Sequence, residues 1–530
     1  MKKTRQYSLL AIVLAVSLLS SCTQDDDSSR SSVSPALEKG IVVSVSDGLY
    51  GSQGGTRAIP NGMETVFEQG DAIGVFAVDA EGKVVRSNVK YVCNGVNWNL
   101  DNATTVPVQF DAGNSYYAYF PYQADLSSLS PSVAEGKTVD AATADGFFAE
   151  LTDNWEVKDN QKLRADYVGS DLMVAKGIPN ATVGDFAIDF NMLHQMGLVL
   201  LSFGEMTREV DASITWTEPV TKSFKGESQP YDWNGICRYI VKPNVEKVLT
   251  ASDDTWTKTV KVSTKGCYRE YKINASMGYT LAVGDIAWSD GSFSKKMQYN
   301  SFYDKRPIGI VAHLGDDDVT CKEKDGEDNR LYTHGIILAT KPVNNFKMYT
   351  ANAKSVADLE GAAAIFAKCA LYNEAVVDYG GLAKTEFLLT QGTAADNLLA
   401  TKVRAYGKKA PTTYSNSDWY IGSCGQWCKI VSNLSGNTAF LDNWTSNNRT
   451  PGWNTRGADA NVKGTLIDAN HMAKTADDYS WGASQAITTS SVGNGGNFVF
   501  FGFAGTNSLY AYLNFINNQD NSWTYPILSF

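Results

Sequence analysis

The stretch Phe67-Glu68-Gln69-Gly70-Asp71-Ala72-Ile73-Gly74-Val75-Phe76 combines a turn with the start of an apolar, β-prone run that continues to Val78. Gly70 and Asp71 favour the turn, and the residues that follow predict a buried strand. The dipeptide Asn94-Gly95 predicts a hairpin. Further strands are expected on both sides, over residues 40–47, 106–110, 115–120 and 186–201. Short strands at this spacing are typical of a β-sandwich.

The strand pattern divides the body of the chain into three parts. Residues 40–205 predict a first β-sandwich, and residues 206–283 predict a second, smaller one. The strands of the second are expected over residues 214–217, 237–241, 257–262 and 268–273. Residues 284–530 have an α+β character, with strands expected over residues 308–312, 335–339, 498–503, 509–515 and 527–530. The whole chain is therefore predicted to be mainly β.

Helices are expected only in the last of these parts. Thr393 predicts the start of a helix that runs to Tyr406. Ser423 and Gln426 form a capping box, and the helix that they begin is expected to end at Gly436.

The amino-terminal segment has the features of a bacterial lipoprotein signal. A basic stretch at residues 2–5 precedes an apolar run, Leu9–Leu19, that is too short to span a bilayer. The sequence Leu-Ser-Ser-Cys at residues 19–22 closes this run and ends at Cys22. We expect residues 1–21 to be removed as a signal peptide and Cys22 to be acylated, for instance with palmitate. The alternative is an ordinary secretory signal that is cleaved nearby.

Residues 22–39 are acidic and rich in serine, which is typical of a disordered tether. Asp25, Asp26 and Asp27 also resemble the surface-export signal of Bacteroidetes lipoproteins. We therefore expect a protein anchored by its lipid to the cell outer membrane and exposed at the cell surface. A plain solvated spacer is the alternative.

Charge and cysteine usage exclude several classes of protein. The 530 residues carry a net charge of −11 and contain no basic block, which argues against nucleic acid as a partner. If Cys22 is acylated, an odd number of cysteines remains, with no disulfide framework. Cys424 and Cys428 have the spacing of one helical turn and are expected to be two packed thiols. A zinc site would need two further ligands, so no metal is expected.

Four segments in the first half resemble signatures of the Mfa-like fimbrillins, the type V pilins of Bacteroidetes. They are residues 67–76, then Tyr-Tyr-Ala-Tyr-Phe-Pro-Tyr at 116–122, Ser-Asp-Leu-Met-Val-Ala at 170–175, and Phe-Asn-Met-Leu-His at 190–194. Their order and spacing agree with the family over about residues 40–283. The resemblance implies two transthyretin-like β-sandwich domains. His194 lies in an apolar run and is expected to be a core residue, not a catalyst.

The last part resembles a C-type-lectin-like module that is found on some of these proteins. The matching segments are residues 284–293, 308–311, 418–427, 479–484 and 525–530. Two departures are Ile421-Gly422, where the module has Leu-Pro, and Tyr525, where it has Arg. The fold is expected to tolerate both changes, but any ligand chemistry of that Arg is in doubt.

The resemblance also implies a mode of assembly. Fimbrillins are lipoproteins that a trypsin-like protease cuts after an Arg, which removes the first strand and opens a groove for a donor strand from a stalk pilin. Arg57-Ala58 fits such a site, in a Gly/Thr loop after the strand expected at 40–47. The alternative is a flexible loop whose Arg has no role. The closing strand at 526–530 is expected to lie inside the lectin-like module, which suggests a tip subunit or another accessory subunit.

Candidate ligand-binding residues lie in the last part. Sugars bind to aromatic faces and to planar amides, so Trp444 and Trp453, with Asn443 and Asn447, are the candidates for a glycan site. The alternative is that these tryptophans pack long loops onto the core. The acidic residues 316–328 could hold calcium, but they lack the EF-hand spacing, and a solvated loop is the preferred interpretation.

No catalytic motif is present, and neither enzyme activity nor a cofactor is expected. Three hypotheses follow. The first is a fimbrial tip or accessory subunit with an adhesive lectin-like head, whose partners are other fimbrillins and a host or bacterial glycan or protein receptor. The second is a surface lipoprotein that binds glycans and never polymerises. The third, an enzyme on the lectin-like fold, is disfavoured.

Overall fold

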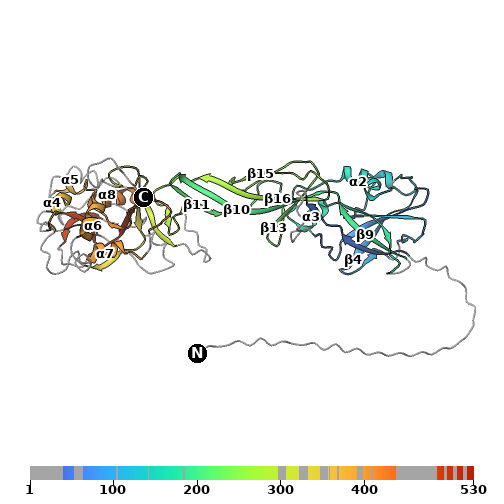
Figure 1. Cartoon of the computed structure of the whole chain (residues 1–530), viewed down its shortest axis with the longest axis horizontal. Helices are drawn as coiled ribbons and strands as arrows, with labels where there is room; N and C mark the ends of the chain where they lie inside the picture. Colours follow the sequence, from blue (N-terminus) through green and yellow to red (C-terminus); the bar gives the residue numbers. More distant parts are fainter. Residues whose placement is uncertain are drawn as a thin grey trace, which may run out of the picture. The chain divides into compact units, whose positions relative to one another are not determined.

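A computed structural model describes the chain in two compact units. The first comprises Met1–Tyr50, Met63–Glu156 and Asp171–Met196, and the second Gly51–Gly62, Val157–Ser170 and Gly197–Phe530, in each case within the described residues. The described residues are 40–52, 64–102, 105–140, 142–182, 186–295, 306–320, 332–346, 356, 359–366, 369, 371–390, 398–407, 410–436, 486–493, 498–504, 510–516 and 522–530. Both units are mainly β, as predicted (Figure 1). No helix in these ranges is long and apolar enough to cross a membrane.

The first unit is built on one sheet that closes on itself. Its strands are β1 (Val42–Asp47), β3 (Ala72–Val78), β4 (Val84–Cys93), β5 (Trp98–Leu100), β6 (Ser115–Phe120), β7 (Met173–Lys176), β8 (Ile178–Pro179) and β9 (Ala187–His194). Their order is β1-β5-β4-β3-β6-β7-β9-β8, and an additional pairing joins β1 to β9. β1 is therefore the strand that closes the sheet.

The sequence predicted most of these strands. β3 follows the Gly70-Asp71 turn and is buried almost throughout, and Cys93 pairs with Trp98 across the predicted hairpin. The expectation of a strand at 106–110 was wrong, because this segment makes an isolated bridge, Gly40 to Gln109. Pro107 has no amide hydrogen, so it cannot complete a ladder there.

Two short helices in the first unit were not predicted. α1 (Ala144–Phe147) packs on β6 and β7, and α2 (Ala149–Asn154) follows it directly. The Phe147 ring stacks on Tyr117 with the ring centroids 4.3 Å apart. Helices this short show no 3.6-residue periodicity, so the sequence pattern cannot reveal them.

The second unit begins with a long, strongly paired sheet. Its strands are β2 (Gly51–Ser52), β10 (Gly197–Asp211), β11 (Ile214–Pro219), β12 (Tyr231–Trp233), β13 (Ile236–Val241) and β16 (Cys267–Gly278), with a separate hairpin of β14 (Lys247–Thr250) and β15 (Thr257–Val260) and a short helix, α3 (Arg164–Ser170). β10 runs parallel to β16 over most of its length, and these two strands form the long ribbon in Figure 1. The boundary predicted between residues 205 and 206 falls inside β10.

The remainder of the second unit is α+β. Its main sheet has the order β18 (Phe293–Ser294), β17 (Ile286–Trp288), β19 (Pro307–Leu314), β20 (Gly335–Ala339), β27 (Pro526–Ser529) and β22 (Tyr420–Ile421). β21 (Val343–Phe346) pairs with β26 (Ser522–Thr524), and β23 (Ala486–Val492), β24 (Phe498–Ala504) and β25 (Tyr510–Ile516) form a third sheet. The helices are α4 (Ala362–Ile365), α5 (Tyr372–Ala375), α6 (Gly381–Thr390), α7 (Leu398–Arg404) and α8 (Cys424–Ser435).

The helix α8 confirms the sequence prediction in detail. Ser423 and Gln426 form the capping box, and Gly436 ends the helix in the left-handed conformation with φ of 67°. Cys424 and Cys428 on this helix are buried, free thiols. The predicted start of α7 at Thr393 lies outside the described residues.

A shared core joins the long ribbon to the α+β part within the second unit. Trp216 of β11 lies with its ring centroid 5.1 Å from Tyr279 and 5.9 Å from Phe293. The same cluster includes Tyr414 and Phe530. The two parts therefore stabilise each other through aromatic packing.

We expect Trp216→Ala to destabilise both parts of the second unit, by about 3–5 kcal/mol, because truncating a buried Trp leaves a cavity. Hydrogen exchange should then speed up in β19 and β20 as well as in β10. The matched control is Trp256→Ala, which truncates a Trp in a different core that includes Leu249 and Val260. A result in which Trp216→Ala loosens β10 but leaves β19 unaffected would contradict the shared core.

Candidate functional site

The strand β1 has pairing partners on both sides. It runs parallel to β9 in continuous register from Val42 opposite Ala187 to Asp47 opposite Met192. On its other side, Val43 lies opposite Trp98 of β5. If β1 were absent, a row of backbone groups on β9 would lose its partners, and such an edge accepts any strand that fits it.

The side chains of β1 alternate between the core and the surface. Ile41, which directly precedes β1, and Val43 are each 5% exposed, whereas Val42 is 58% exposed. Burying an aliphatic side chain contributes about 1.5–3 kcal/mol, so these two residues contribute roughly 3–6 kcal/mol to holding the strand. The site occupied by β1 thus selects an alternating strand, not one particular sequence.

Asp47, Tyr50, Asp171 and His194 form a buried cluster at the end of β1, which we call the His194 clasp. The Nε2 of His194 lies 2.9 Å from Asp47 Oδ1, and its Nδ1 lies 3.0 Å from Asp171 Oδ2. The Tyr50 ring stacks on the imidazole at a centroid distance of 3.7 Å, and the Tyr50 hydroxyl donates to Asp171 Oδ1 at 2.6 Å. Each polar group of the clasp has a partner within it.

The imidazole of His194 carries a positive charge at neutral pH. Burial by itself lowers the pKa of His194, but the carboxylates of Asp171 and Asp47 outweigh it and raise that pKa to about 9. Burial likewise acts to raise the pKa of Asp47, and the hydrogen bond and charge of His194 bring it below its ordinary value. His194 is therefore an imidazolium that donates from both nitrogens.

The segment that contains β1 continues into a strand of the second unit. In that unit, Gly51 and Ser52 of β2 pair in parallel with Cys267 and Tyr268 of β16. The predicted cleavage site, Arg57-Ala58, comes next in the sequence but lies outside the described residues. Among the described residues, every strand pairing made by the chain upstream of Arg57 therefore lies within residues 40–52.

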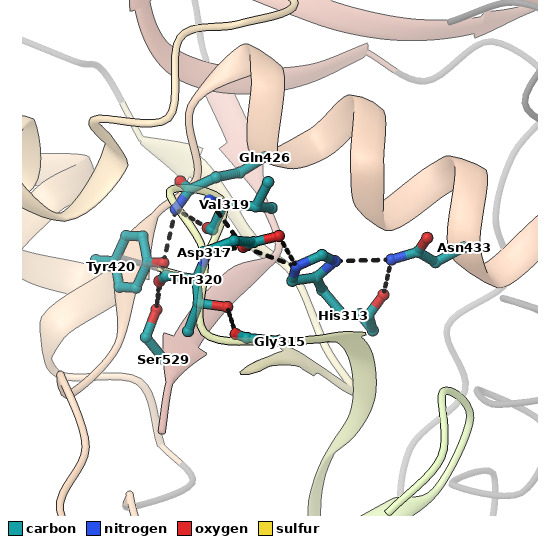
Figure 2. Close-up of polar contacts among 10 residues, drawn as sticks. His313, Gly315, Asp317, Val319, Thr320, Tyr420, Gln426, Asn433 and Ser529 are labelled. Carbon is teal, nitrogen blue, oxygen red and sulfur yellow. Dashed lines mark hydrogen bonds and ion pairs between the residues drawn. The ribbon is translucent and has the colours of Figure 1, made fainter. Parts of the chain in front are cut away.

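Polar side chains around α8 form a second cluster, drawn in Figure 2. Gln426 Nε2 donates to the carbonyl of Val319 at 2.9 Å and to the Tyr420 hydroxyl at 3.0 Å. The Tyr420 hydroxyl lies 2.8 Å from Ser529 Oγ on β27. These bonds fix β27 to α8, which is a structural role.

His313 lies beside this network and is also engaged on both sides (Figure 2). Its Nε2 lies 3.1 Å from Asp317 Oδ1, and its Nδ1 accepts from Asn433 at 3.0 Å. Asp317 also accepts the backbone amides of Val319 and Thr320. The start of the acidic stretch 316–328 is therefore a hydrogen-bonded turn, and residues 321–331 lie outside the described ones. Among the described residues, no group of three or more His, Cys, Asp or Glu side chains could hold a metal ion.

The other predicted site residues cannot be placed. Cys22, Arg57 and Ala58, and the glycan candidates Asn443, Trp444, Asn447 and Trp453, lie outside the described residues. These assignments stay predictions.

Sequence reasoning missed the partners of His194. It placed His194 in the core, which the structure confirms, since its side chain is fully buried. In the sequence, Asp47 ends the strand expected at 40–47, and Asp171 lies in the family signature at 170–175. A buried His needs hydrogen-bonding partners. Acidic residues at the ends of other expected strands were therefore the signal in the sequence that pointed to them.

The chain shows a clear relation to one curated protein. No family model matches it. Over 349 residues it is 31% identical to "Putative fimbrium tip subunit Fim1C" of Bacteroides ovatus. The chain is similar to a fimbrium subunit. The match covers 59% of this chain and 61% of that relative, so the chain spans about three fifths of the relative's length.

Solved structures of fimbrial proteins also align with the chain. A fimbrial protein from Bacteroides ovatus is 19% identical, with 93% of this chain and 99% of that chain covered and a TM-score of 0.36. The fimbrial anchor protein Mfa2 from Porphyromonas gingivalis is 12% identical, with 44% of this chain and 90% of that chain covered and a TM-score of 0.19. The relatives named here all carry the names of fimbrial proteins.

Proposed function

We propose that this chain is a tip or accessory subunit of a type V fimbrium of Bacteroidetes that joins its neighbour by strand exchange. The observation that carries the proposal is the place of β1, which closes the sheet of the first unit and lies upstream of Arg57. Cleavage after Arg57 would disconnect residues 40–52 from the body of the protein. The edge of β9 would then accept a donor strand from a stalk pilin.

The position of β27 supports a place at the tip. β27 pairs with β20 through Ile527 and Leu528, and with β22 through Pro526 and Ile527. Phe530, which follows it, is 1% exposed. A strand held on both sides cannot be donated to a neighbour, so the subunit would accept a strand without passing one on through β27.

The remaining steps of the proposal rest on the sequence. The chain would reach the cell outer membrane as a lipoprotein acylated at Cys22 and be exposed at the surface before processing. The α+β part would be a C-type-lectin-like head that binds a glycan or protein receptor through residues such as Trp444 and Trp453. The similarity to a protein named as a fimbrium tip subunit supports the proposed place in a fimbrium.

We expect an Arg-specific protease to cut the purified protein between Arg57 and Ala58, and the cut chain to form a stable complex with a stalk fimbrillin of the same genome. Amino-terminal sequencing and native mass spectrometry would measure the two steps. The matched control, Arg57→Ala, should stay uncut there and form no complex. Cleavage without any complex would favour a surface lipoprotein that binds its ligand and does not polymerise.

A further inference from the structure

We propose that the donor strand carries a carboxylate, from Asp or Glu, at the position that faces Met192 of β9, and that His194 selects it. This inference rests on the proposed strand exchange. It goes further by naming the chemistry that the first unit requires of its partner. The position is the one that Asp47 occupies in the uncut chain.

The first argument is the division of the clasp between two segments. Asp47 and Tyr50 belong to the segment that cleavage would release, and Asp171 and His194 stay in the body of the unit. Loss of Asp47 leaves the Nε2–H of His194 without its 2.9 Å acceptor, in a site where the imidazole is fully buried. A buried charged donor without an acceptor is costly, so the arriving strand has to replace that acceptor.

The second argument is the number of donors that face Asp47. From the body of the unit, its Oδ1 accepts from His194 and its Oδ2 accepts the backbone amide of Thr65 at 2.7 Å. The Leu49 amide, which also donates to Oδ1 at 3.1 Å, leaves together with Asp47. Thr65 lies downstream of Arg57 and stays in the body after cleavage. Two donors on two separate oxygens match a carboxylate, because an amide offers one oxygen and a hydroxyl offers one as well.

The rest of β1 shows which contacts do not select the partner. Ser44 and Ser46 bond to Asp189 and Asn191 on the exposed face of the sheet, the latter over 3.2 Å. Solvent can replace exposed hydrogen bonds of this kind, so they contribute little. The predicted partner strand therefore has apolar residues at the positions of Ile41 and Val43 and an acidic residue at the position of Asp47.

The test uses cut protein from which residues 40–57 have been removed, together with synthetic peptides of residues 40–52 as stand-ins for a donor strand. We expect the natural peptide to be captured and its Asp47→Asn form to bind at least about tenfold more weakly, because the Asn peptide loses a charge-assisted hydrogen bond to His194. The Ser46→Ala peptide, changed one residue away on the exposed face, should bind within about threefold of the natural one. In the His194→Gln protein, cut and stripped of residues 40–57 in the same way, the natural and Asp47→Asn peptides should bind alike.

The outcomes separate this inference from the proposed function. Equal capture of the natural and Asp47→Asn peptides by the unchanged protein would overturn the carboxylate requirement and leave strand exchange standing. Failure to capture any peptide, or a stalk fimbrillin, would overturn strand exchange and the inference with it. If His194→Gln does not fold, the comparison of the two peptides on the unchanged protein still tests the carboxylate requirement. A lower His194 pKa in the uncut Asp47→Asn chain, measured by nuclear magnetic resonance, is also expected.

Discussion

Removal of residues 40–57 from the cut chain is expected to lower the free energy of unfolding of the first unit by roughly 3–6 kcal/mol or more. This is the contribution of burying Ile41 and Val43 alone. The backbone bonds of β1, such as that from the Val42 amide to the Phe186 carbonyl at 2.9 Å, are lost in addition. This loss is a large part of the free energy of unfolding of a typical domain, so the stripped unit should be close to unfolding.

Hydrogen–deuterium exchange is the measurement that checks this prediction. The amides of β9, Ala187–His194, should exchange much faster in the stripped protein than in the cut protein that retains its strand. Adding back a peptide of residues 40–52 should restore protection. Exchange in β19 of the second unit is the internal control and should stay unchanged. Unaltered protection of β9 after the strand has left would show that β1 does not hold the sheet closed.

Replacing His194 with Gln is expected to destabilise the first unit by about 3–5 kcal/mol, because Asp171 and Asp47 then lack their shared buried cation. His334→Gln is the matched control. His334 pairs with Asp211 at 2.5 Å, but its side chain is 18% exposed and that of Asp211 is 48% exposed. Such a pair contributes about 0–1 kcal/mol. Urea unfolding of the two variants at neutral pH would compare them.

The stability of the first unit should also fall at alkaline pH. The folded-state pKa of His194, about 9, lies above its ordinary value of 6.5. The stabilisation from its charge is therefore complete below pH 6.5 and is lost as the pH rises through about 9, for a total of about 3 kcal/mol. The midpoint of urea unfolding should decrease over this window in the natural protein and much less in His194→Gln. A flat profile in the natural protein would mean that His194 is not held as a cation.

Local sequence patterns predicted the elements that depend on local chemistry. The turn at Gly70 before β3, the hairpin at Asn94-Gly95 and the capping box of α8 are all confirmed, because each is determined by residues close together in the chain. The prediction of a strand at 106–110 was wrong. It relied on the alternation of apolar and polar residues, but Pro107 has no amide hydrogen to donate to a ladder.

The features that depend on contacts distant in sequence could not be predicted in the same way. The parallel pairing of β1 with β9 joins residues about 145 positions apart, such as Ser44 and Asp189. The clasp likewise brings Asp47 and Tyr50 to His194 through the fold and not through any motif. Polar residues at strand ends are common, so composition alone does not show which of them meet.

The central claim is that cleavage opens a strand-shaped groove along β9 that another subunit fills. The most direct measurement is hydrogen–deuterium exchange of β9 in the stripped protein, mixed with a stalk fimbrillin that has or lacks its donor strand. We predict that the amides of Ala187–Met192 become protected only when the stalk subunit carries that strand. A complex in which these amides stay as exposed as in the stripped protein, or no complex at all, would contradict the account.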